Sequence, residues 1–122
     1  MSKVNPTYVP QSRIGVTFGA AVGGFKFITP AGVLPAAGAL ALGVTEHEWD
    51  NGDEGSVVTS GTILVKIKAE LTKGALIASD IAGDGVLAVE GDYVNGILLH
   101  DAAADEVQEV FLTKFKLPVT AP

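Results

Sequence analysis

The stretch Ser56–Lys68, which reads SVVTSGTILVKIK, decides the fold class of this chain. In its second half Ile63, Val65 and Ile67 share one parity, while Leu64 and two lysines take the other. Alternation with period two among β-branched residues is typical of a strand with one buried face. We therefore predict a β-strand here whose three β-branched side chains point into a core.

Shorter segments of the same kind flank this strand on both sides. We predict extended pieces at Ile14–Phe18, Phe25–Phe27, Leu71–Ala78, Val86–Val89, Tyr93–His100 and Val107–Leu117. The turns between them draw on 15 glycines and 6 prolines, the residues that most often punctuate short strands. Strands of this length and spacing indicate an all-β body.

Two local features refine this plan near the C-terminus. Val110 and Leu112 have the opposite parity to Phe111 and Phe115, so the last strand is either bulged or buried on both faces at its middle. Before it, Asp101 precedes three alanines. Its carboxylate is predicted to cap one helical turn by accepting from backbone N–H groups two or three residues on.

The whole chain is predicted to be one mainly β domain with an extended arm. With 122 residues and 48% hydrophobic composition, it has enough apolar material for a single core. We expect an all-β fold, a compact small sandwich or barrel (β-tulip-like) with one short helix or turn. Residues 1–18 are assigned to the N-terminal arm and residues 19–122 to the β-rich domain.

The arm contains two prolines and has neither helical periodicity nor a long alternation. Such a segment can add a strand to the edge of a neighbour's sheet, where main-chain hydrogen bonds and side-chain pockets hold it. The side chains expected to make these contacts are Tyr8, Val9, Ile14, Val16 and Phe18. Ordering costs roughly 1–2 kcal/mol per residue, so we expect the arm to be mobile until a partner binds it.

Charge and composition exclude several classes of function. The net charge is −6 and the 8 basic residues are dispersed, whereas nucleic-acid binding needs a concentrated basic face. The chain has no cysteine, which excludes disulfides, thiolate metal sites and cysteine nucleophiles. No secretory signal is recognisable, and no apolar stretch reaches the roughly 20 residues of a membrane-spanning helix. We expect no nucleic acid, no membrane partner, and a chain that stays in the cytoplasm where it is made.

The most suggestive chemical cluster is the acidic turn, which we define as residues 46–55. It holds five carboxylates and one imidazole, but its glycines do not fall at the positions of a calcium loop. Trp49 within it is interpreted as the cap of a core, with an exposed role in partner binding as the alternative. Nucleophile motifs and phosphate loops are not recognisable in the sequence. We therefore expect no metal, no cofactor and no enzymatic activity.

The order of the pieces between residues 43 and 112 resembles the small head decoration, or capsid cement, proteins of tailed bacteriophages. The stretches that carry the resemblance are GVT at 43–45 before the acidic turn, VVTSG at 57–61, LTKGALI at 71–77, AGDG at 82–85, NGILL at 95–99 and DAAADEV at 101–107. Two features depart from the family pattern. Asp105 stands where glycine is usual, and the acidic turn is longer and more charged.

The resemblance implies a structural virion protein that decorates and stabilises the outer surface of a phage capsid. It also implies that the chain bridges subunits of the major capsid protein as a homo-oligomer, most often a trimer, after assembly in the host cytoplasm. The acidic charge agrees with an outer surface, away from the genome. The alternative is a ligand- or sugar-binding β module of a phage tail or fibre, for which Tyr8, Trp49 and Tyr93 are the aromatic side chains available.

Overall fold

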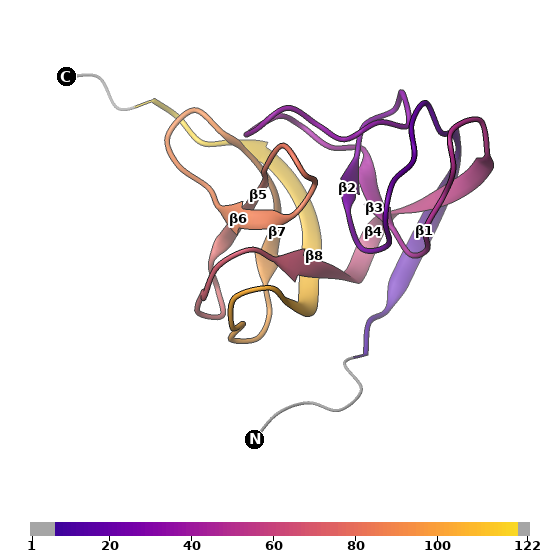
Figure 1. The fold of residues 1–122 in the computed structure, drawn as a ribbon. Helices are drawn as coiled ribbons and strands as arrows, with labels where there is room; N and C mark the ends of the chain where they lie inside the picture. Colours follow the sequence, from indigo (N-terminus) through magenta and orange to yellow (C-terminus); the bar gives the residue numbers. More distant parts are fainter. Residues whose placement is uncertain (1–6, 120–122) are drawn as a thin grey trace.

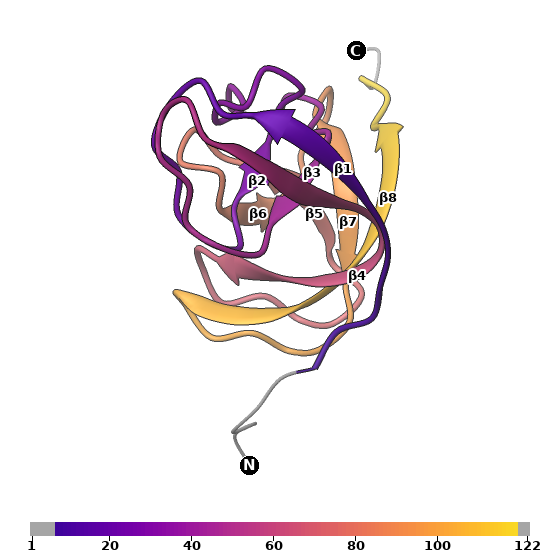
Figure 2. The same ribbon diagram turned by 90° about the vertical axis from the view of Figure 1, so that its right-hand side faces the viewer.

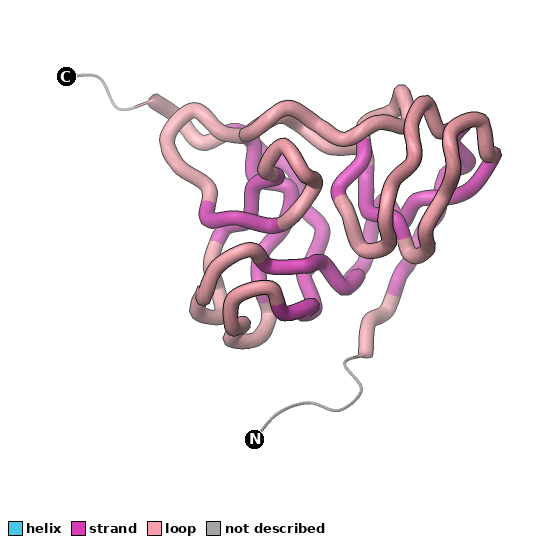
Figure 3. The backbone as a smooth tube through the Cα atoms, viewed as in Figure 1, coloured by secondary structure: helices cyan, strands magenta, loops and turns pink. Residues whose placement is uncertain are grey.

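The computed structural model describes residues 7–119, and every regular element in this part of the chain is a strand (Figure 3). The strands are β1 (Pro10–Thr17), β2 (Phe27–Ile28), β3 (Gly43–Thr45), β4 (Glu54–Ile67), β5 (Leu76–Ser79), β6 (Gly85–Leu87), β7 (Tyr93–Leu98) and β8 (Glu106–Lys116). The predicted all-β fold class is confirmed. Residues 7–119 contain no helix long and apolar enough to cross a membrane.

The long strand β4 organises the fold because it belongs to two sheets. Its first half lies between β1 and β3, and β2 extends this open sheet beyond β3. Its second half pairs with β6 and β8, and the path β6–β5–β7–β8 returns to β4, so these strands close into a small barrel. Figure 1 shows β1 to β3 on one side and β5 to β8 on the other, with β4 between them.

Gly61 marks the point where β4 passes from the open sheet to the barrel. Its φ is +87°, a conformation that glycine adopts without strain. A Cβ at this position would lie 2.4 Å from the carbonyl oxygen of Val9. Beyond the glycine, the side chains of Ile63, Val65 and Ile67 are fully buried, so the predicted strand and its core-facing side are confirmed.

Two hydrophobic clusters form the core. The larger one fills the barrel with side chains such as Ile63 and Val110, and it reaches Phe27 and Val44 of the open sheet. The smaller one lies entirely within the first part of the chain and consists of Val16, Phe18, Val22, Ile28 and Val57. Both halves of β4 therefore contribute buried side chains, and those of Val57 and Ile63 belong to different clusters.

The last strand is bulged, which was one of the two predicted alternatives. Leu112 pairs with Gly96 and Phe115 pairs with Val94, so three steps along β8 oppose two steps along β7. One extra residue therefore lies between Leu112 and Phe115, and a bulge of this kind can re-aim a side chain.

The turn before β8 differs from the predicted capped helical turn. Asp101 Oδ1 accepts from the backbone N–H of Lys73, 2.9 Å away in a distant segment, so the predicted local cap at Asp101 was wrong. Glu106 closes the turn instead, because its Oε1 accepts from the backbone N–H of Ala103. Asp105 has a φ of +62°, in the left-handed region that favours glycine.

The segment predicted to be a mobile arm forms β1. It pairs antiparallel with β4, from Pro10 opposite Gly61 to Thr17 opposite Glu54, and Figure 2 shows the two strands side by side. The edge of β4 in the same chain receives residues 10–17, and the expectation that residues 1–18 become ordered only against a partner stays a prediction. Residues 1–6 lie outside the described residues, and the division into an arm at 1–18 and a domain at 19–122 stays a prediction.

Candidate functional site at the N-terminal strand and the acidic turn

A polar cluster ties the N-terminal segment to the start of the acidic turn. Arg13 donates to Glu46 through Nε at 2.7 Å and through Nη2 at 3.0 Å. The hydroxyl of Tyr8 donates to the same carboxylate at 3.1 Å. Because Glu46 directly follows β3, this forked contact joins β1 to the end of β3, across the intervening strand β4.

The cluster changes the acidity of its members. Hydrogen bonds from Arg13, and to a lesser extent from Tyr8, hold the pKa of Glu46 below its ordinary value against the opposing effect of burial. Burial and the contact with Glu46 raise the pKa of Tyr8. Glu46 is therefore a carboxylate at neutral pH, and the contact weakens only when acid protonates it.

The structure divides the five predicted contact residues into two groups. Val16 and Phe18 are buried in the smaller core cluster, where they stabilise this chain and offer no surface to a partner. Val9 and Ile14 are 64% and 48% exposed, and Tyr8 is half-buried against Phe25. Contact of these residues with another protein stays a prediction. Of the five, Val9 and Ile14 are the ones whose side chains are exposed and accessible to a partner.

Trp49 lies within the acidic turn and packs on the smaller core cluster. Its ring stacks on Phe18 with centroids 5.4 Å apart and planes 11° apart. A Cβ at Gly55 would lie 2.6 Å from the Trp49 ring, so this glycine makes room for the indole. Trp49 thus caps the core, as interpreted from the sequence.

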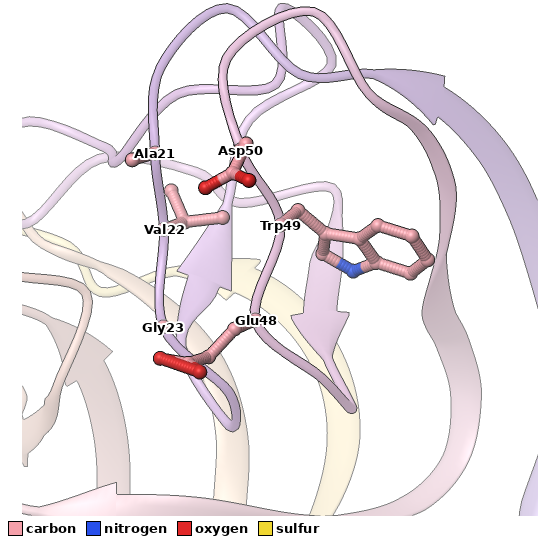
Figure 4. A pocket seen from close by; sticks show the side chains of 6 residues that line it. All are labelled: Ala21, Val22, Gly23, Glu48, Trp49 and Asp50. Atoms are coloured by element: carbon pink, nitrogen blue, oxygen red, sulfur yellow. The ribbon is translucent and has the colours of Figure 1, made fainter.

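The backbone beside Trp49 forms an open hollow of about 500 Å³ with the facing segment Ala21–Gly23. Figure 4 shows the indole pointing away from that segment, whereas Glu48 and Asp50 lie on the side of Val22. A second hollow of about 480 Å³ lies between residues 70–72 and 101–103 and also carries two carboxylates, those of Glu70 and Asp101. Among residues 7–119 no group of three or more His, Cys, Asp or Glu side chains comes together as metal ligands.

A chain of polar contacts that the sequence did not reveal leads from His100 to the N-terminal segment. His100 Nε2 lies 3.2 Å from Glu109 Oε1, and the Thr62 hydroxyl donates to the other oxygen of Glu109 at 2.6 Å. The backbone N–H of Val9 then donates to Thr62 Oγ1 at 2.7 Å. The pairing of β4 with β8 brings Thr62 to Glu109, and separate backbone bonds join Val9 to Thr62 and Leu99 to Glu109, so no spacing in the sequence could have indicated the contact.

Comparison with known proteins gives a match of fold. No protein-family model matches this sequence, and no curated protein matches it. A solved structure described as the head fiber gp8.5 N base in bacteriophage phi29 is similar, with a TM-score of 0.71 at 15% sequence identity. The likeness covers 87% of this chain and 97% of that chain. At this identity it shows a shared fold, and function has to be argued separately.

Proposed function

We propose that this chain is a structural protein of a tailed-phage head, which decorates the outer surface of the capsid and bridges major capsid protein subunits. The observation that supports this most directly is the match in fold to nearly the whole of a phage head-fibre base. The short stretches that resemble decoration proteins point to the same location. In this function the protein acts through its surface, and no reaction is required of it.

The surface suits attachment to the outside of a shell. The net charge of −6 disfavours contact with packaged nucleic acid. The exposed Val9 and Ile14 lie on or next to β1, which among the strands of residues 7–119 pairs with β4 alone. An edge strand of this kind can accept a further strand from a partner. We propose that β1 and its exposed side chains contact the capsid.

We propose further that three copies associate at a local three-fold position of the capsid. Homo-oligomers usually close by point symmetry. Several weak contacts made at once bind far more tightly than any one of them. A small chain with a modest exposed patch would therefore gain its affinity from repetition.

Attachment to heads tests the proposal. Heads of the phage that encodes this chain, prepared without it, are mixed with the purified chain and sedimented. We expect saturable binding, which the double variant Val9→Asp, Ile14→Asp weakens at least about tenfold through loss of apolar contact. The matched control is Val89→Asp, at a residue exposed to 60% on another part of the surface, and it should bind normally. Absence of saturable binding by the unmodified chain would rule the function out.

The alternative is a ligand- or sugar-binding module of a tail or fibre, and the fold match to a fibre base is the observation in its favour. A sugar platform needs exposed aromatic faces. In this chain Trp49 stacks on Phe18 and Lys116 lies over the ring of Tyr93, 5.6 Å from its centroid. If the chain does not sediment with heads but is retained on a glycan array, this alternative replaces the proposal.

A further inference from the structure

A small apolar pocket lies where the connection between β2 and β3 meets β8. Its walls are Pro30, Leu40, Ala41 and Leu42 from the connection and Lys114 from the strand. Its volume is about 180 Å³, below the roughly 300–1,000 Å³ of pockets that hold drug-sized ligands. The pocket therefore fits one aliphatic side chain better than a whole small molecule.

The walls are held in place by buried groups. Asn95 is 1% exposed, and its side chain accepts from the backbone N–H of Ala41 and donates to the carbonyl of Ala39, both at 3.1 Å. The N–H of Leu42 donates to the carbonyl of Ile28 at 2.8 Å. These bonds fix the wall formed by residues 40–42, so this side of the pocket is in place before anything binds.

Lys114 lines this pocket from an irregular part of β8. The extra residue of β8 lies between Leu112 and Phe115, the interval that contains Lys114. Leu112 belongs to the same core cluster as Ala41 of the pocket wall. The ammonium group of Lys114 thus lies beside an apolar hollow.

The Lys114 ammonium has no anionic partner within the described part of the chain. The basic groups that form ion pairs there are those of Arg13, Lys26, Lys66 and His100. Desolvation lowers the pKa of Lys114, although the residue as a whole is exposed to solvent. The sequence has 14 acidic and 8 basic residues, so an accessible ammonium group that forms no ion pair within residues 7–119 can pair with a carboxylate of another molecule.

We propose that this pocket binds a segment of another protein in which an aliphatic side chain is followed directly by a carboxylate residue. The aliphatic side chain fills the space between Leu40 and Leu42, and the carboxylate pairs with Lys114. The positive charge of Lys114 favours a partner segment that carries a negative charge. The small volume of the pocket limits the size of the partner side chain that can enter it. The inference goes beyond the proposed function and does not depend on it, because the test uses the free chain in solution.

A pair of peptides that differ in one charge tests the proposal. The ¹⁵N-labelled chain is titrated with acetyl-Gly-Leu-Asp-Gly-amide and with acetyl-Gly-Leu-Lys-Gly-amide, and amide shifts are followed by NMR. We expect the shifts to concentrate on residues 40–42 and 114, and the aspartate peptide to bind about fivefold more tightly than the lysine peptide. The preference should shrink at about 0.5 M salt, where exposed charges are screened.

Matched variants separate the pocket from general electrostatics. Lys114→Glu should reverse the preference between the two peptides, and Leu40→Asn should weaken both, since Leu40 is already 45% exposed and its loss spares the core. Lys116→Glu changes the net charge equally on the same strand and should keep the original preference. Equal affinity for both peptides, or the same loss in Lys116→Glu as in Lys114→Glu, overturns the proposal. Shifts at the pocket on dilution without peptide would also overturn it, because the occupant would then be a second copy of this chain.

Discussion

The two halves of β4 show how differently one strand can be held. Beyond Gly61, β4 pairs with β8 at every residue from Thr62 to Ile67, and the barrel then closes around a continuous core. Before Gly61, β3 supplies only two pairs, at Val57 and Val58. The longer ladder on this side comes from β1, and it contains register shifts between Pro10 and Arg13.

This difference assigns the two halves different roles in stability. The barrel half closes on itself through strand ladders, whereas the open-sheet half depends on β1, on two buried side chains of the N-terminal segment and on the contact between Arg13 and Glu46. Regions with fewer closed ladders open first under native conditions. We expect the open sheet to lose structure before the barrel.

The largest effect of a single substitution is expected for Phe18→Ala. Phe18 is 1% exposed and stacks on Trp49, so its truncation should cost about 3–5 kcal/mol of the free energy of unfolding. Hydrogen exchange should show β2 and β3 losing protection while β7 and β8 keep theirs. Phe111→Ala on β8 is the control, because Phe111 is 44% exposed and should cost about 1 kcal/mol or less.

Truncation before residue 19 extends this test to the proposed boundary between arm and domain. It removes Val16 together with Phe18 and exposes Val57 of β4. We expect the truncated chain to lose at least as much free energy of unfolding as the variant Phe18→Ala. Unchanged protection of β2 and β3 in the truncated chain would show that residues 1–18 are a separable arm after all.

A change at the junction of the two halves comes next. In Gly61→Ala the new methyl group meets the Val9 carbonyl oxygen at 2.4 Å in a backbone of φ +87°, so we expect a loss of more than about 2 kcal/mol in urea unfolding. Gly52→Ala isolates the backbone effect, because Gly52 has a φ of +90° with nothing within 4 Å of its Cβ position. That variant should lose only about 1 kcal/mol. If Gly61→Ala and Gly52→Ala lost the same free energy of unfolding, β1 would have moved away from the new methyl group at the junction and relieved the crowding there.

A smaller effect is expected for the contact between β1 and the acidic turn. The pKa of Glu46 is lowered in the folded state, so its contribution is present above the ordinary Glu pKa of about 4.3 and is lost as the pH falls through the folded value. Glu46→Gln should cost about 0.5–1 kcal/mol at pH 7 and nothing at about pH 2. Urea unfolding at the two pH values measures this, and a difference that persists in acid would assign the loss to packing.

The smallest effect is expected for the ion pair of the barrel half. Lys66 Nζ lies 3.9 Å from Asp105 Oδ1, and the two side chains are 38% and 63% exposed. Such a pair contributes little in water, so Lys66→Ala should change the free energy of unfolding by less than about 0.5 kcal/mol. A larger loss would show that the barrel also depends on side-chain contacts.

The parts of the fold that the sequence predicted are those encoded by neighbouring residues. The alternation of Ile63, Val65 and Ile67 identified β4 and its buried face, and the parity change in the last strand gave the bulge as one of two alternatives. Closure of the barrel was not predictable, because the parallel contact between β4 and β6 rests on Ile67 opposite Gly85 alone. No local pattern specifies a single pair so far apart in the chain.

The candidate site shows the same limit. The sequence grouped Val9 and Ile14 with Tyr8, Val16 and Phe18 as contact residues, and nothing in it distinguished the exposed pair from the buried pair. Burial of Val16 and Phe18 could not be foreseen, because it depends on which sheet edge receives the segment, and the sequence allowed a neighbour's edge as well as its own. The pocket at Lys114 brings together Leu40–Leu42 and a strand about 70 residues further along the chain, and no local pattern in the sequence specifies that contact.

The pairing of both terminal strands with β4 also determines how this chain carries mechanical load. Pro10, at the start of β1, lies opposite Gly61, and Phe111 of β8 lies opposite Thr62. Tension applied through β1 and β8 would therefore pass from one strand to the other across two adjacent residues of β4, while β2, β3, β5 and β6 lie outside this path. A short route of this kind lets a protein under strain stay folded around its core while its first and last strands carry the force.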